Sequence, residues 1–94
     1  MEFPLEGVLF MEFPLDRQQL FNIIVANTRE VIPELEEHQF IQTDSLALLG
    51  ANSIDRSEII IMSLEKMSLE VPLTAFAGAK NIGELVELLH ERTI

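Results

Sequence analysis

Apolar residues recur at helical spacing in three stretches of the chain. The first stretch has an apolar stripe with further apolar residues beside it: Leu20, Ile24, Val31 and Leu35, flanked by Phe21, Val25 and Ile32. Asp16 is a suitable N-cap, and Pro33 disfavours helical backbone at the residue before it. The pattern predicts a core-facing helix from residue 17 to about residue 31.

A second helix is predicted from Ser53 to Met67, and four successive apolar residues, 59–62, form its centre. At about 100° per residue, these side chains cover every side of the helix. Two arrangements are open. Either the helix is enclosed in the core, or Ile54 and Ile61, with Asp55 and Glu58 nearby, stay partly exposed for partners.

Residues 73–77 are expected to form a short helical turn anchored by Phe76, and a last helix is expected to reach about Arg92. The last helix has an apolar stripe made of Ile82, Leu85, Val86 and Leu89. Asn81 followed by Glu84 has the layout of a capping box. With no convincing strand, the chain predicts an all-α fold with three longer helices and one short helix.

The connection between the first two long helices spans residues 33–52. A connection longer than about 12–15 residues inside a compact domain is usually functional or contains structure of its own. Its second half is apolar, and we expect these residues to pin the loop across the helices: Phe40, Ile41, Leu46, Leu48 and Leu49. Thr43 is a candidate cap for one turn over residues 44–49. Gly50 is expected to end that turn and lead the chain toward Ser53.

Ser53 directly follows Asn52 at the predicted start of the second helix. One interpretation is that Ser53 or Asn52 is an ordinary cap, whose side chain accepts a hydrogen bond from the first-turn amides. The other is that Ser53 carries a phosphate group, which a helix start stabilises. Spacing alone leaves both open, and capping is the commoner case.

The pentapeptide Met-Glu-Phe-Pro-Leu occurs at residues 1–5 and again at residues 11–15. The repeat is too short for a repeat architecture, and its prolines break any helix. We therefore expect residues 1–15 to be an N-terminal extension that is disordered or derived from an expression vector. Residues 16–94 are expected to form one domain.

Composition is that of a small globular protein, with 48% apolar and 23% charged residues among 94. The net charge of −10 repels nucleic acid and anionic lipid, so we expect binding to neither, and basic protein surfaces are the natural partners. A simpler interpretation is that the charge keeps the domain soluble. No apolar run approaches the roughly 18 residues of a membrane span, so we expect a soluble, cytoplasmic protein.

Candidate catalytic and metal-binding groups are few. The chain has no cysteine, and neither His38 nor His90 is placed as a base for Ser53. The glycines that permit a strained nucleophile elbow do not flank Ser53. No segment has the ligand order of a calcium loop. We expect no catalytic residue and no metal site.

The residues around Ser53 resemble the acyl carrier proteins over about residues 17–92. The resemblance rests on Leu49-Gly50-Ala51-Asn52-Ser53-Ile54, Glu58, the apolar helix and Leu69-Glu70-Val71-Pro72. In that family the serine of an Asp-Ser-Leu motif takes 4′-phosphopantetheine from coenzyme A. Here Asn52 replaces the aspartate and Ile54 the leucine. The resemblance implies a four-helix acyl-carrier-type bundle, a covalent 4′-phosphopantetheine on Ser53 and no catalytic activity of its own.

Residues 50–60, 68–72 and 78–85 resemble a subgroup, the freestanding donor carriers of polyketide β-branching. The subgroup implies an acetyl thioester donated to a hydroxymethylglutaryl (HMG) synthase-like enzyme. Implied partners are that enzyme, a phosphopantetheinyl transferase, and an acyltransferase or decarboxylase that loads the carrier; we expect a monomer. Alternatives are a general polyketide, peptidyl or fatty-acid carrier, or an unmodified acidic helical interaction domain.

Five residues beside Ser53 are the candidates for partner recognition: Ile54, Asp55, Arg56, Glu58 and Ile61. The carboxylates are expected to steer the carrier onto basic surfaces, and the isoleucines to supply a short-lived apolar contact. Arg56 is expected to select the cognate synthase and reject others.

Overall fold

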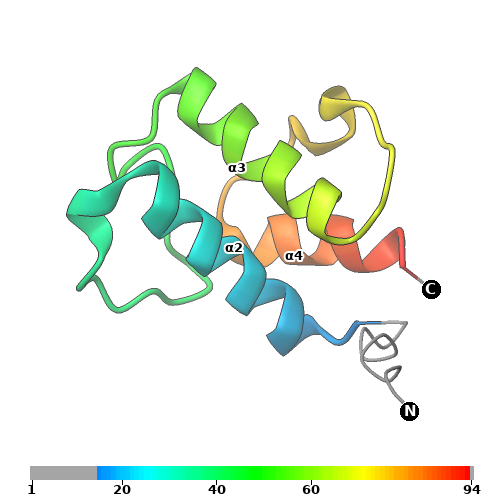
Figure 1. The fold of residues 1–94 in the computed structure, drawn as a ribbon, viewed down its shortest axis with the longest axis horizontal. Coiled ribbons are helices and arrows are strands. Elements are labelled where there is room, and N and C mark those ends of the chain that lie inside the picture. The colour runs from blue at the N-terminus through cyan, green and yellow to red at the C-terminus, as the bar shows by residue number, and fades with distance from the viewer. Residues whose placement is uncertain (1–14, 94) are drawn as a thin grey trace, which may run out of the picture.

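The computed structural model describes residues 15–93 (Figure 1). Within that range it contains α2 (Arg17–Val31), α3 (Ser53–Lys66) and α4 (Ile82–Glu91), with two short 3-10 segments, η1 (Pro33–Leu35) and η2 (Leu73–Phe76). No strand occurs among these residues, which confirms the all-α prediction. The three longer helices lie where the apolar pattern predicted them, and the predicted short helix is a 3-10 turn.

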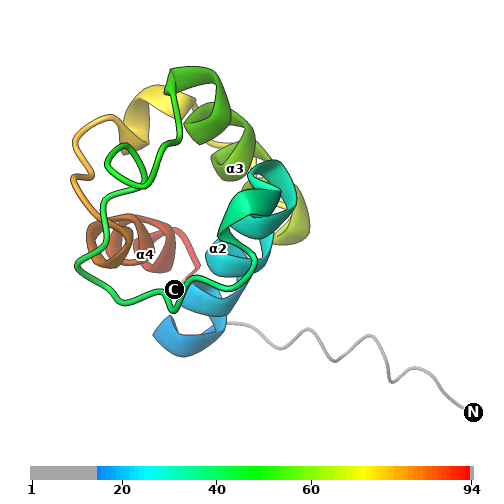
Figure 2. The same ribbon diagram turned by 90° about the vertical axis from the view of Figure 1, so that its left-hand side faces the viewer.

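The three α-helices enclose one apolar core. α2 packs against both α3 and α4, and η2 contacts the same two helices. Figure 2, viewed from the end that carries the long loop, shows α2, α3 and α4 arranged around a common centre. Each helix contributes fully buried side chains, among them Leu20 and Ile24 of α2, Ile59 of α3 and Leu89 of α4. Phe76 is 3% exposed and anchors η2 as predicted.

Asp16 and Asn81 cap their helices as the sequence predicts. The Asp16 carboxylate accepts from the Gln19 N–H at 2.8 Å, and the Gln19 side-chain oxygen accepts from the Asp16 N–H at 2.8 Å. Asn81 accepts from the Glu84 N–H at 2.8 Å, but the Glu84 carboxylate accepts from the Lys80 N–H instead of the Asn81 N–H. The predicted capping box at Asn81 is therefore only half formed.

The connection between α2 and α3 departs from the prediction in three respects. It begins with η1, which was not predicted, although proline favours the first position of such a segment. The turn over residues 46–50 is held by Ser45, whose hydroxyl accepts from the Leu48 N–H at 3.2 Å, so the prediction of Thr43 as the cap was wrong. Of the five apolar residues expected to pin the loop, Leu46 alone is buried. The expectation was wrong for Ile41 and Leu48, which are exposed.

Leu15, the last residue of the predicted extension, is 3% exposed and packs into the core. The repeat and the rest of that predicted segment lie outside the described residues. No helix in the described part of the chain is long and apolar enough to cross a membrane.

Candidate functional site

Asn52 is the N-cap of α3. Its side-chain oxygen accepts from the Asp55 N–H at 2.8 Å, and the Asp55 carboxylate accepts from the Asn52 N–H at 3.2 Å. These two bonds form a complete capping box, which satisfies backbone groups that a helix start otherwise leaves unpaired. The choice that the sequence left open between Asn52 and Ser53 is thereby decided in favour of Asn52.

Ser53 is the first residue of α3 and is exposed. Among the described residues its hydroxyl takes part in no hydrogen bond, because the capping role belongs to the residue before it. A free hydroxyl at the positive end of a helix is open to modification, and an anion attached there is favoured by the helix dipole.

The turn before α3 is fixed by backbone bonds. Gly50 has a φ of 111°, its N–H donates to the Ala47 carbonyl at 3.1 Å, and the Ala51 N–H donates to the Leu46 carbonyl at 2.9 Å. Ala51, one residue before the cap, is 2% exposed and packs in the core. Arg56 reaches back from α3, and its Nη1 donates to the Ala51 carbonyl at 2.7 Å.

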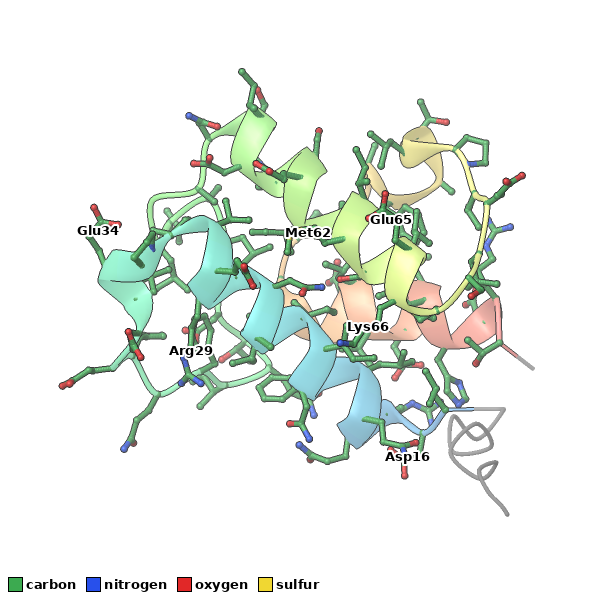
Figure 3. All side chains as sticks on the ribbon, viewed as in Figure 1. Asp16, Arg29, Glu34, Met62, Glu65 and Lys66 are labelled. Carbon is green, nitrogen blue, oxygen red and sulfur yellow. The ribbon has the colours of Figure 1, made fainter. Side chains whose placement is uncertain are left out.

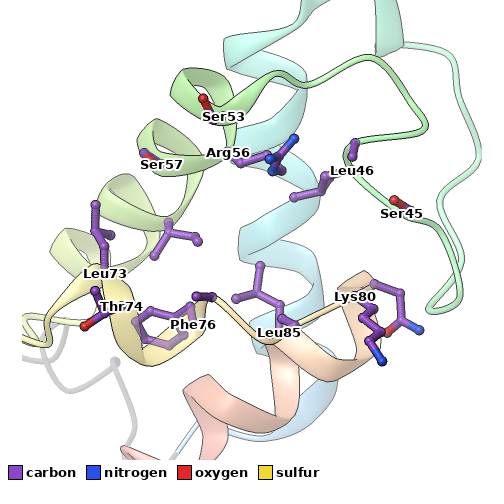
Figure 4. A pocket seen from close by; sticks show the side chains of 15 residues that line it. Ser45, Leu46, Ser53, Arg56, Ser57, Leu73, Thr74, Phe76, Lys80 and Leu85 are labelled. Carbon is purple, nitrogen blue, oxygen red and sulfur yellow. The ribbon is translucent and has the colours of Figure 1, made fainter.

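A cavity of about 590 Å³ opens beside Ser53, between α3, η2 and the start of α4 (Figure 4). Its walls include Ser53, Arg56 and Ser57 of α3, with Leu46, Phe76 and Leu85 as apolar surface. α2 and η2 each contact both α3 and α4. The cavity lies between these elements, and residues 45–47 of the loop line it as well.

Ile54 and Ile61 are 75% and 42% exposed, whereas Ile59 of the same helix is fully buried. The interpretation of α3 as an enclosed central helix was therefore wrong, and the predicted exposure of Ile54 and Ile61 is confirmed. Their contact with partners stays a prediction. Glu58 is exposed as well. Asp55 and Arg56 are half-buried, and both use their side chains to bind backbone at the start of α3.

Two exposed leucines near Ser53 were not among the candidates for partner contact in the sequence. Leu48 is 89% exposed on the turn before α3, and Leu73 is 37% exposed on η2, at the wall of the cavity. No periodic pattern distinguishes the buried Leu46 from the exposed Leu48, because a turn has no regular inside face. For Leu48 the available signal was its place five residues before Ser53, whereas Leu73, twenty residues after Ser53, gave none.

His38 and His90 lie outside the cavity that Ser53 lines. His38 Nε2 pairs with the Asp44 carboxylate at 2.9 Å, so its partner is a loop residue away from Ser53. Among the described residues, no three histidine, aspartate or glutamate side chains gather as a metal site.

Two known proteins are similar to this chain, although no protein-family model matches it. The polyketide biosynthesis acyl-carrier-protein AcpK of Bacillus subtilis (strain 168) is 47% identical over 78 residues, covering 83% of this chain and 95% of that protein. A chain in the crystal structure of the curacin-pathway HMG synthase in complex with its acetyl donor acyl carrier protein matches with a TM-score of 0.79 and 47% identity. That match covers 82% of this chain and 99% of the other.

The helical fold and these two similarities define a small carrier domain. The chain belongs to the acyl carrier protein family. It is a carrier without catalytic activity of its own, of the kind used in polyketide biosynthesis, and its predicted resemblance to the donor carriers of β-branching is confirmed.

Proposed function

We propose that Ser53 carries 4′-phosphopantetheine and that the modified chain donates an acetyl group to an HMG-synthase-like enzyme during polyketide β-branching. The donor role is supported by the similarity to a chain from the complex of such a synthase with its acetyl donor carrier. In this proposal η2 is the short fourth helix of the carrier bundle.

The free hydroxyl of Ser53 is the observation that carries the proposal. Because Asn52 supplies the cap, a group added to Ser53 removes no hydrogen bond that holds α3. The exposed hydroxyl is accessible to a transferase, and a phosphodiester there lies at the positive end of the helix. The residues present therefore fit the prosthetic group, which supplies a thiol on a flexible arm.

Ile54, Glu58 and Ile61 are the proposed contacts for partner enzymes, since their side chains are exposed beside Ser53. Asp55 and Arg56 belong to the same turn, but both side chains hold it in place. The proposed partners are the HMG-synthase-like enzyme, a phosphopantetheinyl transferase and a loading acyltransferase or decarboxylase, which the chain meets as a cytoplasmic monomer.

Intact-mass measurement after incubation with coenzyme A, magnesium and a broad-specificity transferase tests the anchor. The wild-type chain is expected to gain the mass of one phosphopantetheine. Ser53→Ala is expected to fold and gain nothing, while the control Ser57→Ala, one helical turn further along α3, is modified like the wild type. Modification of Ser53→Ala, or none of the wild type, contradicts the proposal, and the latter outcome favours an unmodified interaction domain.

A further inference from the structure

Arg56 is a half-buried cation in a chain of net charge −10, yet its side chain binds backbone. Among residues 15–93, no carboxylate oxygen lies within 4.0 Å of its guanidinium. Its Nη1 donates instead to the Ala51 carbonyl at 2.7 Å. A hydrogen bond from a charged donor is stronger than one between neutral groups, so this contact fixes the Ala51 carbonyl firmly.

The same residue also holds the next carbonyl of the chain. The Arg56 N–H donates to the Asn52 carbonyl at 2.9 Å as the first backbone bond of α3. Side chain and backbone of Arg56 therefore fix two successive carbonyls, those of Ala51 and Asn52, immediately before Ser53. In Figure 4 the Arg56 side chain extends from α3 toward the loop that carries Leu46.

The other side of this junction is held by the core. Ala51 is buried, and its N–H donates to the carbonyl of Leu46, which is also buried. The loop is thus fixed to the core through Leu46 and to α3 through Arg56, and Ser53 lies two residues beyond the junction. Without the guanidinium, the link from the Ala51 carbonyl to α3 is lost, and the direction in which the chain enters the helix is less constrained.

We infer that Arg56 is a positioning residue, which orients the Ser53 hydroxyl for modification by holding the turn before α3. The inference rests on the proposed role of Ser53 as the prosthetic-group anchor, and it assigns Arg56 a role different from direct partner selection. A nucleophile that is misplaced by a small distance reacts more slowly even when the two proteins still bind. The effect is therefore expected in kcat of the transferase and not in KM for the carrier.

The test compares transferase kinetics of the unmodified wild-type chain with those of Arg56→Met, Arg56→Lys and Lys66→Met. Methionine keeps the helix propensity and most of the side-chain length but donates no hydrogen bond. Lys66 is the matched control, because it is an exposed cation at the opposite end of α3 (Figure 3). Amide hydrogen exchange of Ala51, measured on the same samples, reports on the turn directly.

Arg56→Met is expected to lower kcat by about tenfold with KM for the carrier unchanged, and to speed exchange at Ala51 while leaving α2 and α4 unaffected. Arg56→Lys, which keeps a charged donor, is expected to recover part of the kcat, and Lys66→Met to match the wild type. The inference about Arg56 is overturned if Arg56→Met leaves kcat unchanged and raises KM, or if Lys66→Met lowers kcat by the same factor. Neither outcome affects the proposed function. A wild-type chain that is never modified overturns the proposed function as well.

Discussion

Two residues with left-handed backbone stand on either side of α3. Gly50 has a φ of 111° in the turn before the helix, and Ser68 has a φ of 56° just after it. At Ser68 the chain forms a Schellman motif, with the Leu69 N–H bonded to the Leu64 carbonyl at 2.9 Å and the Ser68 N–H bonded to the Glu65 carbonyl at 3.1 Å. Ser68 therefore ends the helix that carries Ser53, and Gly50 shapes the turn that leads into it.

Gly50→Ala is expected to destabilise the protein by about 1–3 kcal/mol, because a side chain disfavours that φ. No atom lies within 4 Å of the added Cβ, so the cost comes from the backbone alone. The control is Gly78→Ala, which also has open space around the Cβ but no left-handed φ. Urea unfolding checks both variants, and an equal loss of stability in the two would contradict the backbone explanation.

The sequence identified the important residues around Ser53 but did not determine the role of each. It singled out Ser53, Asn52 and Asp55, but it did not determine which residue caps α3, because serine and asparagine both do so readily. The free hydroxyl of Ser53 became evident only once the Asn52 side chain was seen bonded to the Asp55 N–H. Ser68 gave no signal, since glycine is the usual residue at its position.

The loop between α2 and α3 is a structural element that holds the start of α4. The Asp44 carbonyl accepts from the Ile82 N–H at 2.9 Å, and the Gln42 carbonyl accepts from the Gly83 N–H at 2.8 Å. The loop itself is held by the Asp44 carboxylate, which accepts from the Ile41 N–H and pairs with His38 Nε2, each at 2.9 Å. Stability of this segment therefore depends on the charge of Asp44.

The Ile41 N–H, and after it the His38 ring, lower the pKa of Asp44 below its ordinary value. Since the folded pKa lies below the unfolded one, these bonds stabilise the fold above the unfolded pKa of about 3.9. That stabilisation is lost as pH falls through the folded pKa. We expect Asp44→Asn to unfold at lower urea than the wild type at pH 7, with the difference vanishing in strong acid.

The control for this comparison is Glu37→Gln, which removes an exposed carboxylate from the same loop. It is expected to follow the wild-type curve. A stability difference between Asp44→Asn and the wild type that stays constant from pH 7 down to strong acid would show that the ionised carboxylate is not what holds the loop.

Helix periodicity, Pro33 and the caps at Asp16 and Asn81 were enough to predict the three longer helices almost to the residue. The loop was less predictable, because its structure comes from individual side-chain bonds such as Ser45 to Leu48. Thr43 and Ser45 are both plausible caps in the sequence, and only the fold decides which one meets a backbone N–H. The same holds for η1, which depends on a local proline and not on a periodic stripe.

The molecule as a whole is acidic, with exposed apolar residues near Ser53. Ile54, Leu48 and Leu73 are all exposed, and the net charge is −10. Such a surface suits brief binding to basic enzymes, since charge speeds the encounter and is screened by salt. In the proposed function, the exposed apolar residues then add a specific but short-lived contact. The whole-chain charge was evident from composition, whereas the set of exposed leucines required the structure.

Ile54→Ala is expected to change stability by less than about 0.5 kcal/mol, because the side chain is already in solvent. It is expected to raise the KM of the HMG-synthase-like enzyme for the loaded carrier by roughly tenfold. Ile41→Ala is the control, since Ile41 is 58% exposed but lies on the loop before Asp44, outside the cavity beside Ser53. Equal KM values for the two variants would argue against α3 as the contact surface.

Acetyl transfer, followed by the intact masses of carrier and enzyme together, is the most direct test of the proposed donor role. The modified wild-type chain is loaded with acetyl and mixed with an HMG-synthase-like enzyme whose activity has been established with another donor carrier. We predict that the acetyl group leaves this chain and appears on the enzyme, and that Ser53→Ala transfers nothing. If the loaded chain keeps its acetyl group in the presence of the active enzyme, yet supports chain elongation by a ketosynthase, it is a general carrier and the donor role is contradicted.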